Sequence, residues 1–356
     1  MKCCNPKSMV CVHENGSPFT ILVPCGHCYG CEQTNKAEWC VRLSYECKGK
    51  YVAFITLTYS DEKVPLLKGV KRDSVFLESR KPENLRNYGN LCAIYRPDCT
   101  EFLKNLREDW RSFRGDNSLC RFVINFEYGD DTNRPHAHCI IIFPSDTTFK
   151  QYSEYMLHLG AHPYNDRRTN EFPPRHTCVL WSFGNVVTQY LYDSNDTAQI
   201  SSYASKHCTK SCCGSKRQQL EAPIFRRTST FKGGIGTKQM ASDPNVIAAF
   251  ENKTYITSVG EHGKVYKVGV PRSVKRVLHP QNLTENELYE VSVKTLNTEM
   301  KSIKEWCVLN GKNPHFWYLF KDDYYSAAFA VDCKARKDME RRRKLKHDEK
   351  KRKRNL

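Results

Sequence analysis

The sequence predicts an α+β fold built around an antiparallel β-sheet. Segments rich in β-branched and aromatic residues alternate along the chain with segments whose apolar residues recur at helical spacing. Two strand-like segments, residues 121–128 and 138–143, are joined by the polar stretch 129–135, which is the pattern of a β-hairpin with a longer loop. Strands and helices that interleave, with an antiparallel hairpin among them, are typical of the α+β class.

The first hundred residues and those just after them supply three predicted elements. Residues 31–48 mix aromatic and aliphatic residues with charges and predict a helix, whereas residues 51–59 (YVAFITLTY) predict a buried strand. Residues 60–99 contain three prolines and scattered glycines, and we expect a long irregular insertion there. A second helix is predicted over residues 100–113, whose apolar side chains recur at helical spacing: Phe102, Leu103, Leu106 and Trp110.

The later part of the chain predicts fewer elements. Residues 179–181 and 186–192 predict a further strand or strand pair, and residues 200–210 predict a helix. After Cys213 no clear pattern is present until residues 288–308, which predict another helix.

The charge of the chain favours a polyanionic partner. Its 356 residues include 56 Lys and Arg against 39 Asp and Glu, a formal net charge of +17. Binding to nucleic acid releases condensed counterions, although an anionic membrane would also attract such a protein. Residues 334–356 alone have a net charge of +9. This tail fits a nonspecific grip on nucleic acid, a solvated helix or a nuclear import signal.

No secretory signal or membrane span is expected. Residues 1–10 lack the apolar core of a signal peptide, and strongly apolar stretches such as 139–143 are too short to cross a bilayer. We therefore expect an intracellular protein with no membrane partner. In a reducing compartment its eighteen cysteines are expected to act as metal ligands or small core residues, not as disulfides.

A pair of histidines forms a candidate metal site. His136 and His138 are two residues apart on a predicted strand, so their imidazoles share one face, and neutral imidazole binds many divalent metals. Antiparallel pairing of the predicted hairpin brings Glu127 close to both. Two histidines and one carboxylate leave coordination positions open for substrate. An isolated His-x-His is more often a pair of surface residues, and the same ligand set occurs in non-haem iron oxygenases.

A tyrosine on the predicted helix at residues 200–210 is a candidate nucleophile. Four residues of this helix share one face: Tyr203, Lys206, His207 and Lys210. A phenolate beside a lysine and a metal can attack phosphorus, because the metal stabilises charge on the phosphate oxygens. Without the two histidines, a core tyrosine flanked by solvated lysines would be the ordinary interpretation.

Taken together these motifs resemble a known family. Residues 51–59, Pro135-His136-Ala137-His138 and Tyr203-Ala204-Ser205-Lys206 resemble the three motifs of rolling-circle replication initiators with the His-hydrophobic-His (HUH) signature. More narrowly, the chain resembles the replication initiators of microviruses, small single-stranded DNA bacteriophages, of the gokushovirus type. The following motifs support this, in order over about residues 20–280: PCGHCYGC at 24–31, FITLTY at 54–59, EYG at 127–129, GIG at 234–236 and VPR at 270–272.

The resemblance implies a ferredoxin-like HUH nuclease core that nicks and rejoins single-stranded DNA at a phage origin. In such a protein His136, His138 and Glu127 would hold a divalent metal, Mg²⁺ or Mn²⁺. Tyr203 would be the nucleophile, leaving a 5′-phosphotyrosyl link and a free 3′-hydroxyl, and Lys206 would position the phosphate.

The resemblance also implies partners. Lys210 and Arg134 are expected to contact the DNA. No helicase motif or phosphate-binding loop of the Gly-x-x-x-x-Gly-Lys type is present, so a host helicase would unwind the duplex and a polymerase would extend the 3′-end. The host bacterial cytoplasm is the expected location.

One position departs from the family pattern. Microvirus initiators often have a second tyrosine four residues after the first, where this chain has His207. Alternation of two tyrosines at that spacing is therefore not expected. Tyr190, Tyr192 or a second copy of the protein would have to complete the cycle, and His207 is either a proton shuttle for Tyr203 or a structural residue.

The N-terminal cysteines form a second candidate metal site. Cys25, Cys28 and Cys31 offer three thiolates within seven residues, and Cys3, Cys4 or Cys11 would supply a fourth ligand for structural zinc. Iron–sulfur ligation is less favoured, because the usual fourth cysteine before a proline is absent. Thiols without metal are the other alternative.

These motifs divide the chain into four parts. They are a Cys-rich segment with its helix at residues 1–48, the HUH nuclease domain at 49–280, a helical region at 281–333 and the basic tail at 334–356. Three other functions stay open: a plasmid or transposon HUH relaxase or transposase, a non-catalytic basic zinc-containing DNA-binding protein, and a non-haem iron oxygenase.

Overall fold

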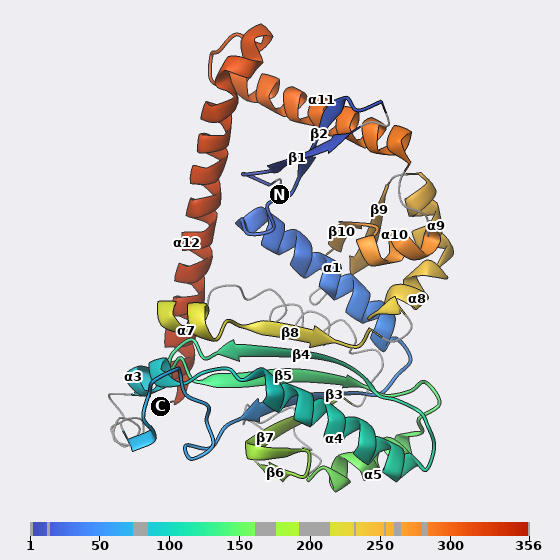
Figure 1. Ribbon diagram of the computed structural model, residues 1–356, viewed down its shortest axis with the longest axis vertical. Helices are drawn as coiled ribbons and strands as arrows, with labels where there is room; N and C mark the ends of the chain where they lie inside the picture. The colour runs from blue at the N-terminus through green and yellow to red at the C-terminus, as the bar shows by residue number, and fades with distance from the viewer. Residues whose placement is uncertain are drawn as a thin grey trace. The chain divides into compact units, whose positions relative to one another are not determined.

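The computed structural model describes most of the chain and divides it into two compact units (Figure 1). The described residues are 3–12, 15–73, 85–160, 176–191, 214–230, 233–252, 254–259, 265–279 and 284–354. One unit, here the sheet unit, comprises residues 36–278, and the other, the terminal unit, combines residues 1–35 with 279–356. The boundary between them falls within helix α1, Tyr29–Cys47.

The sheet unit contains a six-stranded antiparallel sheet in the order β6-β7-β3-β5-β4-β8. Its strands are β3 (Val52–Thr58), β4 (Arg121–Tyr128), β5 (Pro135–Ile142), β6 (His176–Cys178), β7 (Trp181–Leu191) and β8 (Phe225–Thr228). The predicted α+β class is therefore confirmed. The predicted hairpin is formed by β4 and β5, and β5 lies inside the sheet with a partner on each side.

Two helices cover one face of the sheet, α4 (Arg96–Arg114) and α5 (Phe149–His158). Alternate residues of the strands, among them Ile55 and Cys139, point into this core with Leu106 and Trp110 of α4, and all four are fully buried. The apolar stripe predicted for residues 100–113 thus faces the sheet. The helix begins earlier than predicted, because Pro97 occupies its first turn, where a missing N–H costs nothing.

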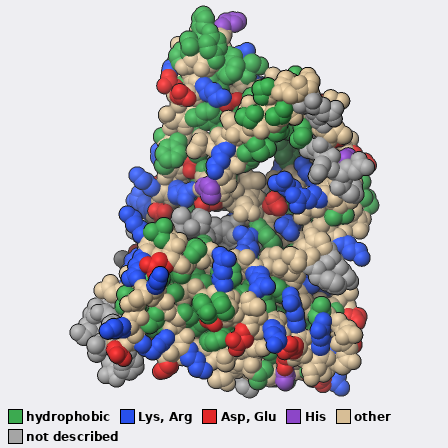
Figure 2. Space-filling model, viewed as in Figure 1, with side chains coloured by type: hydrophobic (Ala, Val, Ile, Leu, Met, Phe, Trp, Pro, Cys, Tyr) green, Lys and Arg blue, Asp and Glu red, His purple; other side chains and the backbone are tan. Residues whose placement is uncertain are grey.

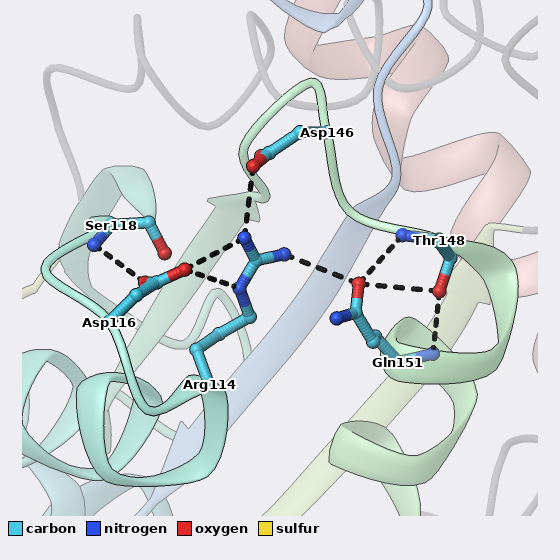
Figure 3. A network of polar contacts seen from close by, with 6 residues as sticks. All are labelled: Arg114, Asp116, Ser118, Asp146, Thr148 and Gln151. Carbon is cyan, nitrogen blue, oxygen red and sulfur yellow. Dashed lines mark hydrogen bonds and ion pairs between the residues drawn. The ribbon is translucent and has the colours of Figure 1, made fainter.

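The end of α4 is tied to the start of α5 (Figure 3). The Arg114 guanidinium contacts the carboxylates of Asp116 and Asp146, each at 2.9 Å, and donates to Oε1 of Gln151 at 3.2 Å. Gln151 also forms a capping box with Thr148 at the start of α5. This network sets how the two helices lie on the sheet.

The opposite face of the sheet is divided along the strand direction. At one end its side chains are apolar and pack against α1: Val52, Phe54, Val123, Ile140 and Ile142 meet Trp39, Leu43 and Cys47. At the other end, here the site end, the same face bears polar side chains: Thr56, Thr58, Asn125, Glu127, His136 and His138. Because side chains alternate along a strand, this division is a direct consequence of the sequence of each strand.

A buried carboxylate holds α1 against the sheet. Glu46 is fully buried, and its oxygens contact Lys50 Nζ at 2.7 Å and Arg121 Nη1 at 3.4 Å. The backbone N–H of Gly236 donates to the same carboxylate at 2.7 Å. Gly236 has a φ of +67°, and a Cβ there would lie 2.2 Å from the carbonyl oxygen of Arg42, so only glycine fits.

The remaining elements of the sheet unit are short. They are α3 (Leu85–Leu91), α7 (Lys216–Glu221), α8 (Thr237–Ala241), α9 (Pro244–Glu251), the hairpin β9 (Tyr255–Val259) and β10 (Val265–Gly269), and α10 (Arg272–Leu278). A second apolar cluster joins Val41 of α1 to Met240, Val246 and Val268. α1 therefore packs on two sides.

The terminal unit is built from both ends of the chain. Its elements are the hairpin β1 (Lys7–Val12) and β2 (Pro18–Val23), α11 (Glu285–Leu309), the 3₁₀ segment η5 (Pro314–Phe320) and α12 (Lys321–Arg354). β2 packs on α11, where Ser292 Oγ donates to the carbonyl of Thr20 at 2.6 Å. The basic tail continues α12 as helix. No helix of the described residues is long and apolar enough to span a bilayer.

Replacing Glu46 with alanine should destabilise the sheet unit by about 3–5 kcal/mol, because Lys50 and Arg121 would then be left with an uncompensated buried charge. Urea unfolding followed by circular dichroism measures the loss. The control is Glu108→Ala, which removes an exposed pair with Lys104 and should cost less than about 1 kcal/mol. Equal effects of the two substitutions would contradict this account.

Candidate metal centre

The candidate metal centre is produced by strand register. Glu127 of β4 lies directly opposite His136 of β5, and His138 is the next residue of β5 on the same face. The sequence predicts a strand only from His138 onward, whereas β5 begins at Pro135, so both histidines belong to it. Three residues from two strands thus point to one place at the site end.

The three side chains converge on a single carboxylate oxygen. Glu127 Oε1 lies 3.2 Å from His136 Nε2 and 3.4 Å from His138 Nε2. Glu127 is 2% exposed and His138 8% exposed, while the imidazole of His136 is 20% exposed. The group is therefore nearly buried, with its opening on the side of His136.

Neighbouring groups orient both imidazoles. His136 Nδ1 lies 3.3 Å from the carbonyl oxygen of Arg134, which only accepts, so Nδ1 bears the proton and Nε2 presents a lone pair in the neutral ring. His138 Nδ1 lies 3.0 Å from Thr56 Oγ1, and its ring stacks on Phe54 with centroids 5.5 Å apart. Contacts of this kind to the second ring nitrogen are typical of metal-bound histidines.

The arrangement fits a divalent cation. Two lone pairs at 3.2 Å, from His136 Nε2 and Glu127 Oε1, require a positive group between them, either a proton or a metal ion. A metal about 2.1 Å from each ligand would hold adjacent ligand atoms about 3.0–3.4 Å apart, which matches the observed spacing. Glu127, His136 and His138 are the described residues that would hold it.

The turn between β4 and β5 is supported from below. Asn133 has a φ of 53°, a conformation that asparagine tolerates, and its Nδ2 donates to Asn90 Oδ1 at 2.7 Å. The fully buried amide of Gln218 donates to the carbonyls of Gly89 and Cys92, each at 2.7 Å. This support fixes the turn that leads into His136.

Arg134 is engaged within the protein. Its Nη1 lies 2.6 Å from Asp61 Oδ1, its Nη2 donates to the carbonyl of Tyr59, and its guanidinium lies over the ring of Tyr88. These contacts pin the start of β5 to the segment after β3. Contact of Arg134 with DNA stays a prediction.

The predicted nucleophile lies outside the described residues. Tyr203, Lys206, His207 and Lys210 all fall in residues 192–213, as does Tyr192, and the side chain of Tyr190 is also not described. The flanks of this segment are described: Leu191 pairs with Val52, at the end of the sheet opposite the site end, and Gly214 lies against the ring of Tyr128 at the site end.

Three described tyrosines near the site end are occupied elsewhere. Tyr59 donates to Asp98 at 2.8 Å and Tyr88 donates to Asp61 at 3.0 Å. Burial, with the nearby carboxylate, raises the pKa of Tyr59, and burial with Cys92 raises that of Tyr88. Tyr128 donates to the carbonyl of Ala222 at 2.7 Å. None of these three phenols is suited to attack phosphorus.

Other features of the site face and its surroundings were not predicted. On β8, Arg226 pairs with Asn125, which in turn pairs with His138, and the Arg226 guanidinium stacks 4.6 Å from the Trp39 ring. The neighbouring Arg227 lines a groove of about 320 Å³ on the α4 side: Thr100, Leu103, Lys104, Arg107, Glu108, Arg111 and Arg227. Figure 2 shows Lys and Arg side chains spread over this side of the sheet unit. Only the basic residues around Phe225 signalled these contacts in the sequence.

The structure also brings the predicted cysteines together. The sulfur atoms of Cys3, Cys25, Cys28 and Cys31 all lie within 4.8 Å of one another. Cys4 lies instead with Cys28 and Asp332, and Cys11 is on β1. Burial raises the pKa of Cys28, but the backbone N–H groups of Cys4 and Cys31 and the neighbouring thiols outweigh it and lower that pKa to about 7.

Replacing Thr56 with valine should weaken Mn²⁺ binding about 10–100-fold, because His138 would lose the hydroxyl that orients its ring. Isothermal titration calorimetry measures the affinity. Thr58→Val is the matched control, since Thr58 lies two residues further along the same face and its hydroxyl donates to the carbonyl of Asn185 instead. Equal losses in both variants would show that Thr56 does not act through His138.

Comparison with known proteins points to replication. The model of a family of replication-associated proteins, named after the ORF2 protein, matches residues 52–211. The replication-associated protein ORF2 of Spiroplasma virus 4 is 35% identical over 132 residues, which are 35% of this chain and 33% of that protein. The replication-associated protein VP4 of Bdellovibrio phage phiMH2K is 26% identical over 219 residues, 60% of this chain and 56% of that protein.

The extent of these matches is limited. They span about a third and just over half of the length of the two relatives, and no solved structure matches the chain significantly. The family match nevertheless contains β3, β4 and β5 and all three members of the candidate metal centre. The comparisons confirm the resemblance predicted from the motifs: the chain resembles the microvirus-type replication initiators, and its residues 52–211 match the ORF2 family of replication-associated proteins.

Proposed function

We propose that this protein initiates rolling-circle replication by cutting single-stranded DNA at a phage origin and later rejoining it. The observation that supports this most is the convergence of Glu127, His136 and His138 in the segment that matches the replication-associated family. A divalent metal there, Mg²⁺ or Mn²⁺, would polarise the scissile phosphate and stabilise charge on its oxygens.

The sheet fits the HUH nuclease core that we propose for residues 49–280. The strand with both histidines is internal and lies between β3 and β4, which supply Thr56 and Glu127. Helices α4 and α5 cover the opposite face, so the site end of the histidine face is free of them. Arg226 extends this face with positive charge, which suits a DNA backbone.

In the proposed reaction the Tyr203 phenolate oxygen forms a bond to phosphorus, and the bond from phosphorus to the 3′-oxygen breaks. The 3′-oxygen takes up a proton and becomes a free hydroxyl, while the 5′-phosphate stays on the tyrosine. Lys206, one helical turn on, would hold the phosphate. Attack by a 3′-hydroxyl on the phosphotyrosine reverses the step and rejoins the strand without a nucleotide.

The described flanks are compatible with this role for Tyr203. Eleven residues separate it from Gly214, which lies at the site end. A chain of that length reaches at most about 36 Å, longer than the roughly 23 Å length of β3. The phenols of Tyr59, Tyr88 and Tyr128 are engaged elsewhere, so they do not compete for the role.

The remaining parts of the proposal concern partners. Lys210, Arg134 and the basic tail at residues 334–356 would contact DNA, and a host helicase and polymerase would unwind and extend it. We place this activity in the host bacterial cytoplasm. A plasmid or transposon relaxase or transposase would use the same chemistry on other DNA, whereas a non-catalytic DNA-binding protein would bind without cutting.

Tyr203→Phe should abolish formation of a covalent protein–DNA adduct, because phenylalanine has no oxygen to bond phosphorus. The assay incubates the full chain with end-labelled single-stranded origin DNA and Mn²⁺ and resolves adducts by denaturing electrophoresis. Tyr95→Phe, at an exposed tyrosine, is the control and should keep wild-type activity.

Removal of metal with EDTA should also abolish the adduct, and Glu127→Gln should lower its rate at least about 100-fold. Wild-type protein that binds the DNA but forms no adduct would overturn the proposal in favour of a non-catalytic DNA-binding protein. An adduct that persists in Tyr203→Phe would transfer the nucleophile to another residue. Iron-dependent turnover without DNA would favour an oxygenase.

A further inference from the structure

Four cysteines of the terminal unit surround one point. Cys3 precedes β1, Cys25 and Cys28 lie in the loop after β2, and Cys31 lies in the first turn of α1. We propose that these four thiolates bind one zinc ion, and that this zinc has a structural role separate from the metal centre on the sheet. The proposal does not depend on the proposed nuclease activity.

The distances fit a single tetrahedral ion. With Zn–S bonds of about 2.3 Å, the sulfur atoms of a tetrahedral site lie about 3.8 Å apart. Cys25 Sγ and Cys31 Sγ are 3.9 Å apart, and no pair among the four exceeds 4.8 Å. An iron–sulfur cluster would need wider spacing, since several iron and sulfide atoms would lie between the thiolates. A disulfide would need a separation of about 2.05 Å.

Backbone amides point at the sulfur atoms. The N–H groups of His27 and Cys28 donate to Cys25 Sγ at 3.5 and 3.3 Å, and the N–H of Cys31 donates to Cys28 Sγ at 3.5 Å. The N–H of Cys25 donates to Cys3 Sγ at 3.3 Å. Such donors stabilise the negative charge that four thiolates would bring to one zinc ion.

The structure also selects the fourth ligand. The sequence leaves Cys3, Cys4 and Cys11 open, and among these only Cys3 joins the group. Cys4 lies closest to Cys28 and Asp332, but the Asp332 carboxylate already accepts from the N–H groups of Tyr29 and Gly30 at 3.1 and 3.2 Å. Asp332 thus caps the start of α1 and is not available to a metal.

A zinc ion here would join separate parts of the chain. Cys3 and the loop at residues 25–31 are its direct ligands, and α12 reaches the same loop through Asp332 and Ala328. Arg336 of α12 donates to the carbonyl of His27 at 2.8 Å. Zinc would therefore stabilise the terminal unit by fixing its N-terminal segment to α1 and α12.

The test measures metal in the full-length protein. Purified with zinc, the wild type should contain about one tightly held zinc per chain by mass spectrometry, and a mercurial should release it in step with thiol modification. Cobalt substitution should give the intense thiolate charge-transfer band and visible bands of a tetrahedral sulfur site. Cys3→Ser and Cys25→Ser should lose the metal and the band, whereas Cys4→Ser and Cys11→Ser should keep both.

Several outcomes would overturn the proposal. They are wild-type protein without zinc, iron with labile sulfide in place of zinc, full zinc content in Cys3→Ser, and loss of zinc from Cys11→Ser. If Cys25→Ser does not fold, the mercurial titration of the wild type still decides, because a site of four thiolates predicts protection of four thiols until zinc is released. Adduct formation on DNA is assayed separately, so failure here leaves the nuclease proposal intact.

Discussion

The pairing of β4 with β5 is the constraint on which the rest of the structure depends. Its register places Glu127 opposite His136 and, on the other face, Ile124 opposite Cys139 in the core beneath α4 and α5. A shift of one residue would turn every side chain of a strand to the wrong face, burying His138 among aromatic rings. The core that stabilises the fold therefore also holds the ligand geometry, and the two cannot vary independently.

Local patterns were enough to predict much of this arrangement. The bounds of β4 follow from its run of β-branched and aromatic residues, and the stripe of apolar residues around Leu106 gives the buried side of α4. Strand alternation puts His136 and His138 on one face, and the hairpin brings Glu127 to them. These inferences succeed because the residues involved are close in sequence or paired through one short turn.

What was not predicted depends on contacts between distant parts of the chain. Nothing local shows that the short, basic strand β8 pairs with β4, because its register is set by a partner a hundred residues away. The choice of Cys3 over Cys4 and the capping of α1 by Asp332 are of the same kind. Whether Tyr203 meets the histidines stays a prediction, since it lies outside the described residues.

The composition of the terminal unit has a consequence for the order of events during translation. The sheet unit is one continuous stretch, residues 36–278, and all of its partners have left the ribosome before α11 and α12 are made. Cys3 and its neighbours are synthesised first, yet Asp332 reaches them only near the end. The part with the catalytic ligands can therefore mature on the nascent chain, while the oldest residues wait for the youngest.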